Sequence, residues 1–128
     1  MTIRLARLAR TCATALLLTV AATGAAQAQR VIRIVVPFGP GAVQDTIARM
    51  FNNELGQILG ANVLVENRAG ASGIIGSDLI AKSPPDGYTL GIATSTTHIT
   101  APILNAQLPY DPVKDFAPVA LVGLSPYV

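Results

Sequence analysis

A short apolar segment that runs into a loop rich in proline and glycine constrains the fold of this chain more than any other feature. Residues 30–36 are mostly β-branched, residues 37–44 hold two prolines and two glycines, and an amphipathic segment begins directly afterwards. β-branched residues favour a strand, and proline and glycine end it. At a junction of strand, loop and helix, backbone N–H groups and the positive end of the helix dipole point to one place. That place suits an anion such as a carboxylate or phosphate.

The rest of the chain alternates strand and helix signals. Apolar residues recur at helical spacing over Gln44–Leu59, and Gly60 predicts the end of that helix. The other predicted elements, in chain order, are a strand at 62–67, a small-residue loop at 68–73, a helix at 74–83, a turn at 86–87, a strand at 88–93, a helix at 97–105, a polar loop at 108–115 and an apolar strand at 117–128. This order predicts an α/β fold with a mainly parallel sheet flanked by helices. Ligands of such sheets bind beyond the carboxyl ends of the strands, so the candidate binding loops are 37–44, 68–73 and 94–97.

The first 28 residues are typical of a secretory signal peptide. Three arginines at positions 4, 7 and 10 precede an apolar stretch at 12–22, and Ala26-Gln27-Ala28 is a small-x-small cleavage motif. We expect cleavage after Ala28. The alternative is an uncleaved membrane anchor, since a span needs about 20 mostly apolar residues. The uncharged stretch at 11–29 almost reaches that length, but threonine and glutamine residues dilute it.

Removal of this leader changes the charge of the chain. The full chain has nine Lys and Arg against seven Asp and Glu, and three of the arginines lie in the leader, so the mature part has six against seven and a net charge of −1. This balance excludes a basic surface for nucleic acid. The single cysteine, Cys12, also lies in the leader, so the mature part has no disulfide framework. Export without disulfides fits a bacterial periplasm.

Four runs in this order resemble the substrate-binding proteins of tripartite tricarboxylate transporters, also called the Bug family. They are Val35–Phe38 with Pro40-Gly41, Asp45 and Ala48-Arg49; Val65–Gly73 with Gly76 and Asp78; Pro85–Leu90; and Leu108–Val119. The resemblance covers residues 31–128. It implies a two-lobed fold of the type II periplasmic binding proteins, which closes on a small organic carboxylate and delivers it to the membrane permease subunits of the transporter.

The same resemblance implies how the chain is organised. Residues 29–128 would form the N-terminal part of the first lobe and end at the crossing toward the second lobe. We expect a longer protein, because the chain ends inside an apolar stretch. The full-length protein would be a monomer in the periplasm, and it would be a binding protein rather than an enzyme. The sequence implies no cofactor and no metal site, since it lacks the spacing of metal ligands.

One segment departs from the family pattern. Where the family usually has Gly-Gly-Ser-Thr-Asp or a similar run, this chain reads Gly41-Ala42-Val43-Gln44-Asp45. The methyl group of Ala42 restricts backbone angles that glycine would allow, and Val43 replaces a hydroxyl group by an apolar branch. The identity of the carboxylate therefore stays open.

Nine residues are candidates for contact with the carboxylate. They are Phe38, Gly41, Ala42, Asp45, Gly70, Gly73, Ser95, Thr96 and His98. We expect backbone amides at the glycines, and hydroxyl groups at 95–96, to hold the anion. Each residue also has a structural interpretation: core packing for Phe38, loop geometry for the glycines, and a satisfied ring at a helix start for His98. Asp45 would repel an anion directly, so we expect it to shape the loop, cap the helix or hold a bridging water.

Three other functions are alternatives. A carboxylate-sensing protein that feeds a signalling partner could use the same fold. A dinucleotide-binding enzyme could use Gly39, Gly41 and the carboxylate of Glu66, but Gln44 holds the position of the third glycine. A hydrolase is disfavoured, because the chain has no Gly-x-Ser-x-Gly motif and one histidine.

Overall fold

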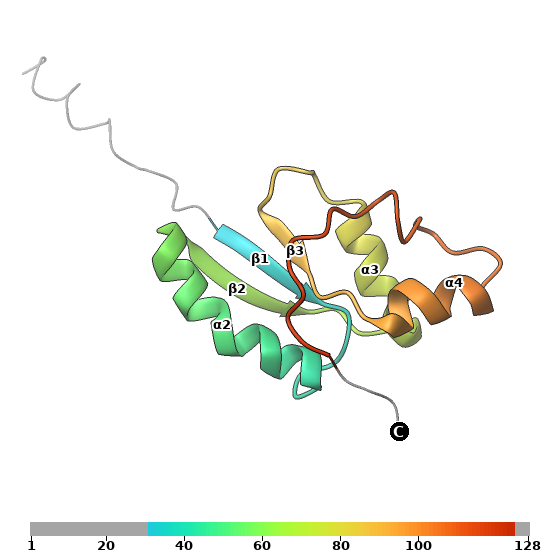
Figure 1. Ribbon diagram of the computed structural model, residues 1–128, viewed down its shortest axis with the longest axis horizontal. Coiled ribbons are helices and arrows are strands. Elements are labelled where there is room, and N and C mark those ends of the chain that lie inside the picture. The colour runs from blue at the N-terminus through green and yellow to red at the C-terminus, as the bar shows by residue number, and fades with distance from the viewer. Residues whose placement is uncertain (1–30, 125–128) are drawn as a thin grey trace, which may run out of the picture.

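A parallel three-stranded sheet forms the centre of the fold (Figure 1). The structure is a computed structural model that describes residues 31–124. The strands are β1 (Val31–Val36), β2 (Asn62–Asn67) and β3 (Thr89–Gly91), in the spatial order β2-β1-β3. Both pairings are parallel, and Ile34 lies between Val65 of β2 and Leu90 of β3. All three carboxyl ends therefore lie at one edge of the sheet, as the alternation of strands and helices predicts.

Two helices cover opposite faces of this sheet (Figure 1). Helix α2 (Val43–Leu59) packs on β1 and β2, and helix α3 (Ile74–Ala81) packs on β1 and β3. The core lies under α2, where Ile32, Ile34 and Val36 of β1 meet Ala48 of the helix and Val63 of β2. These strand positions alternate because side chains of a strand point to the two faces in turn. Residues 31–36 fold as the central strand because most of them are β-branched, and such residues favour a strand.

Most predicted elements are confirmed within one or two residues. Helix α2 ends at Gly60, which has the left-handed backbone (φ 60°) that favours glycine at this position. A 3-10 turn at Ala71–Gly73 lies inside the predicted loop. The third strand is shorter than the predicted 88–93, although Ile92 N–H still donates to the Val35 carbonyl. None of the helices in the described part of the chain has the length and apolarity that a membrane span requires.

The predicted helix at 97–105 has an irregular first turn. A π turn, η2 (Thr96–Thr100), leads into a short α-helix, α4 (Ala101–Leu104), with Pro102 in its first turn. The proline ring would crowd the carbonyl group four residues earlier in a regular α-helix, and proline has no N–H to donate. A wider turn directly before Pro102 avoids this conflict.

The predicted strand at 117–128 is wrong over the residues that can be judged. Residues 117–124 have no strand structure and are exposed, and 125–128 lie outside the described residues. Apolar composition alone does not make a strand, which also needs a partner for its backbone N–H and C=O groups. The leader at 1–28 with its cleavage motif, and Arg30 of the first predicted strand, also lie outside the described residues.

Candidate functional site

Three loops meet at Gly73, at the carboxyl edge of the sheet. A Cβ atom added to Gly73 would lie 2.6 Å from Cγ2 of Thr97, 3.3 Å from Cζ of Phe38 and 3.4 Å from the carbonyl oxygen of Pro37. These residues come from the loops that follow β1, β2 and β3. Gly73 itself is buried and has φ +91°, so glycine is needed here both for its backbone angles and for lack of space. The sequence therefore brings the three predicted binding loops together.

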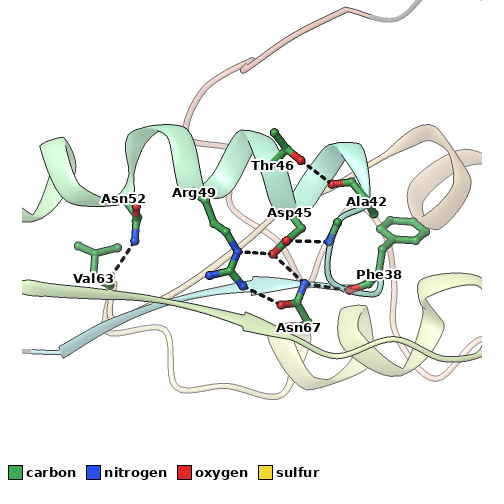
Figure 2. Close-up of polar contacts among 9 residues, drawn as sticks. Phe38, Ala42, Asp45, Thr46, Arg49, Asn52, Val63 and Asn67 are labelled. Atoms are coloured by element: carbon green, nitrogen blue, oxygen red, sulfur yellow. Dashed lines mark hydrogen bonds and ion pairs between the residues drawn. The ribbon is translucent and has the colours of Figure 1, made fainter.

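The loop after β1 is fixed by a buried carboxylate. Asp45, in the first turn of α2, is 4% exposed and accepts hydrogen bonds from Gly41 N–H, Arg49 Nε and Asn67 Nδ2, each 2.9 Å long. Figure 2 shows the side chains of Asp45, Arg49 and Asn67 pointing toward one another between α2 and the end of β2. Asn67 also donates to the carbonyl group of Phe38 at 3.1 Å. Asp45 thus shapes the loop, which is one of the roles that the sequence indicates for it.

This environment stabilises the charged form of Asp45. The hydrogen bond from Arg49, followed by those from Gly41 and Asn67, lowers the pKa of Asp45 from 3.8 to about 2. Its negative charge is matched by Arg49 in an ion pair of 2.9 Å, so it does not face an incoming anion unpaired. The Gly41 N–H donates to Asp45, so it is not free to donate to a ligand.

The N-terminus of α2 opens on the same edge. The residue that precedes the helix is Ala42, which has extended backbone angles (φ −65°, ψ 158°) and offers no side chain to cap the helix. These angles are ordinary for alanine, so the methyl group imposes no strain on the loop. An uncapped helix start presents backbone N–H groups and the positive end of the helix dipole, which favour an anion.

The loop after β2 has an unusual backbone. Gly70, Ala71, Ser72 and Gly73 all have positive φ, and the values for Ala71 and Ser72 are 45° and 54°. Such angles cost about 1–3 kcal/mol per residue with a side chain, and they cluster where a loop contacts a ligand. Ala71 and Ser72 are exposed. Sequence reasoning did not single them out, although the flanking glycines are a signal of a special backbone.

The loop after β3 is held by Thr97. Thr97 is fully buried, and its hydroxyl group bonds with Thr94 and lies 2.9 Å from Nδ1 of His98. Ser95 and Thr96 are half-buried next to it. Whether these two contact a ligand stays a prediction.

His98 lies in a group of rings. Its ring meets that of Phe116 edge-on, with centroids 4.6 Å apart, and the centroid of Tyr110 lies 6.3 Å away. Burial lowers the pKa of His98 below its usual value of 6.5. This packing agrees with the structural interpretation of His98, although Nε2 is buried without a hydrogen-bond partner in the part of the chain that the structure describes.

The candidate edge has no unpaired cation. Within residues 31–124 every lysine and arginine is in an ion pair: Arg33 and Arg68 with Glu66, Arg49 with Asp45, Lys82 with Asp78 and Lys114 with Asp111. An anion here would be held by N–H and O–H groups. Two open hollows of about 550 and 490 Å³ lie elsewhere, one at 102–115 and one between α2 and β2, and neither is lined by a candidate residue.

The dinucleotide alternative fits this edge poorly. Glu66, its proposed ribose ligand, is engaged by the two arginines that flank it in space. The described residues also contain no group of three or more His, Cys, Asp or Glu side chains that could hold a metal ion.

Comparison with known proteins identifies the class to which this fold belongs. Among solved structures, the fold is similar to that of MatC from Rhodopseudomonas palustris with bound malate, with 41% identity and a TM-score of 0.69 over 73% of this chain and 32% of that chain. A second R. palustris structure, with adipate, has 37% identity and a TM-score of 0.62 over 65% of this chain and 28% of that chain. The fold is also similar to that of the periplasmic binding protein BugD, with 37% identity and a TM-score of 0.64 over 68% of this chain and 29% of that chain, and it is that of the periplasmic binding proteins.

The sequence comparisons give the family. A family model described as the tripartite tricarboxylate transporter family receptor matches residues 47–128, more than half of the chain. The chain belongs to this family. Protein BugT of Bordetella pertussis is 43% identical over 100 residues, which cover 77% of this chain and 31% of that protein. The chain spans less than a third of the length of each of these relatives.

Proposed function

We propose that this chain is part of a periplasmic receptor that captures a small di- or tricarboxylate for a tripartite transporter. One observation carries the proposal: the loops after all three strands meet at Gly73, where exposed backbone and an uncapped helix start lie on one edge. Such an edge suits a carboxylate, since N–H and O–H groups bonded to a charged acceptor contribute about 1.5–3 kcal/mol each. The malate and adipate in the two related structures support the same ligand class.

The chain spans less than a third of the length of these relatives, which supports a site that is completed elsewhere. Residues 29–128 would supply one wall, as the N-terminal part of a first lobe, and a second lobe would supply the other. Closure of two lobes would exclude water and strengthen the hydrogen bonds to the anion. The receptor would be exported by the leader, cleaved after Ala28, act as a monomer and deliver its ligand to membrane permease subunits.

Calorimetry on the full-length protein tests the ligand class. The probes are malate, adipate and citrate, with acetate and glucose as controls. We expect binding of at least one di- or tricarboxylate and none of glucose. Ser95→Ala and Thr96→Ala should each weaken that binding by roughly three- to tenfold, the effect of one lost hydrogen bond.

Thr100→Ala is the matched control, because Thr100 is an exposed threonine at the far end of the same turn. It should leave affinity within about twofold of the original value. A folded protein that binds none of the carboxylates contradicts the proposal. Co-purification with the permease subunits would separate transport from the alternative of a sensor, which would instead be recovered with a signalling partner.

A further inference from the structure

Tyr110 lies outside the candidate edge but contacts a residue that builds it. Tyr110 is 5% exposed, and its hydroxyl group donates a buried hydrogen bond of 2.8 Å to the carbonyl oxygen of Thr97. Thr97 in turn packs against Gly73, since a Cβ at Gly73 would lie 2.6 Å from its Cγ2. A continuous packed path therefore leads from Tyr110 through Thr97 to the loop after β2.

The carbonyl group of Thr97 needs an outside partner because of Pro102. In the π turn η2, the N–H of Ala101 bonds to the carbonyl of Thr96, five residues earlier. The next bond in that pattern would join Thr97 to Pro102, and proline has no N–H. A buried carbonyl group without a partner costs about 1–3 kcal/mol, so the Tyr110 hydroxyl supplies a bond that the helix cannot make.

The ring of Tyr110 is itself held in place. It meets Phe116 edge-on, with centroids 5.6 Å apart and planes at 83°, and Phe116 also contacts the ring of His98. These three rings fix the direction from which the hydroxyl group approaches Thr97. The loop at 105–116 thus contacts η2 both through ring packing on His98 and through one hydrogen bond of defined direction to Thr97.

We propose that Tyr110 is a positioning residue for ligand binding, which sets the place of Thr97 against Gly73 and so the spacing of two loops of the candidate edge. The inference rests on the proposed function for its ligand, but not for the link between the two loops. Tyr110 would not touch the ligand.

The test removes only the hydroxyl group and then replaces its hydrogen bond. Tyr110→Phe in the full-length protein should weaken binding of malate or adipate by roughly three- to tenfold. Adding Pro102→Ala to that variant provides an N–H for the Thr97 carbonyl and should restore affinity to within about twofold. Tyr88→Phe is the control. It removes a tyrosine hydroxyl that makes no hydrogen bond within residues 31–124, directly before β3.

A ligand-free measurement separates the two proposals. The NMR signals of the Gly73 and His98 amides should move in Tyr110→Phe, return in the double variant and stay unchanged in Tyr88→Phe. Tyr110→Phe with unchanged affinity and an unchanged Gly73 signal overturns this inference and leaves the proposed function intact. A loss of affinity that Pro102→Ala fails to restore also overturns it. If the original protein binds no carboxylate, the proposed function fails, and the Gly73 signal still decides whether Tyr110 acts on that loop.

Discussion

Gly41 donates its backbone N–H to Oδ2 of Asp45, so the loop after β1 is closed onto the first turn of the helix that follows it. The same carboxylate binds Arg49 and Asn67, and Asn67 belongs to the neighbouring strand β2. One buried group thereby fixes the position of a loop relative to both α2 and the sheet. Because Arg49 compensates the negative charge of Asp45 within this network, Asp45 can lie beside a site for anions.

Replacement of Asn67 tests this network. Asn67→Ala removes the hydrogen bonds to Asp45 and to the carbonyl group of Phe38, and it also removes an acceptor for Arg49. We expect the free energy of unfolding to fall by about 1–2 kcal/mol. Urea denaturation of the full-length protein measures the change. Asn53→Ala, which replaces an exposed amide on α2, should change stability by less than about 0.5 kcal/mol, and an equal loss in both variants would contradict the prediction.

The acid stability of the protein should depend on Asp45. Its pKa is lowered from 3.8 to about 2 by hydrogen bonds from Arg49, Gly41 and Asn67, so the unfolded chain takes up a proton before the folded chain does. This contribution is complete above pH 4 and is lost as the pH falls toward 2. Asp45→Asn should therefore lose less stability than the original protein between pH 4 and 2.

Denaturation curves at several pH values measure this difference. Asp111, whose pKa is also lowered by backbone N–H groups of Lys114 and Val113, is present in both proteins, so its contribution is common to both stability curves. The comparison therefore isolates Asp45. Parallel stability curves for the two proteins would show that the hydrogen bonds to Asp45 do not favour its charged form.

His98 should affect folding stability at higher pH than Asp45 does. Burial lowers its pKa from 6.5, so below pH 6.5 the unfolded chain binds a proton that the folded chain still excludes. Folding stability then falls as the pH drops from 6.5 toward the folded pKa. His98→Asn keeps a side chain that can bond to Thr97 but does not titrate. The variant should lose less stability than the original between pH 7 and 5, and an equal loss would indicate a His98 that titrates normally.

Local patterns in the sequence are enough to predict the sheet, because strands and helices of this size follow the spacing of apolar residues. The meeting of the three loops also follows, since parallel strands end at one edge. The hydrogen bonds of Asp45 are harder to predict from the sequence, because Asn67 lies 22 positions away and nothing near either residue indicates that they are partners. The positive φ of Ala71 and Ser72 is missed for a related reason, as neither residue type favours it. Residues 117–124 are apolar enough for a strand. A strand also needs a second strand to bond with, and the composition of one segment does not show whether that partner exists.

Gly73 gives the sharpest test of the candidate edge. In Gly73→Ala the new methyl group would lie 2.6 Å from Cγ2 of Thr97, at a backbone φ of +91° that alanine disfavours. We expect a loss of stability of about 1–3 kcal/mol and a clear loss of affinity for malate or adipate, because the loops must move apart. Gly39→Ala is the control, since no atom lies within 4 Å of a Cβ at that position and its φ is not positive.

A second substitution separates crowding from backbone strain. Thr97→Ser removes Cγ2 but keeps the hydroxyl group that bonds to Thr94, so it opens space for the methyl group that Gly73→Ala introduces. In the double variant Gly73→Ala with Thr97→Ser, affinity should recover in part, while the backbone strain at position 73 remains. Calorimetry and thermal unfolding of the original protein, the two single variants and the double variant measure both effects. Unchanged affinity in a folded Gly73→Ala protein would place the binding site away from this edge, whatever its stability.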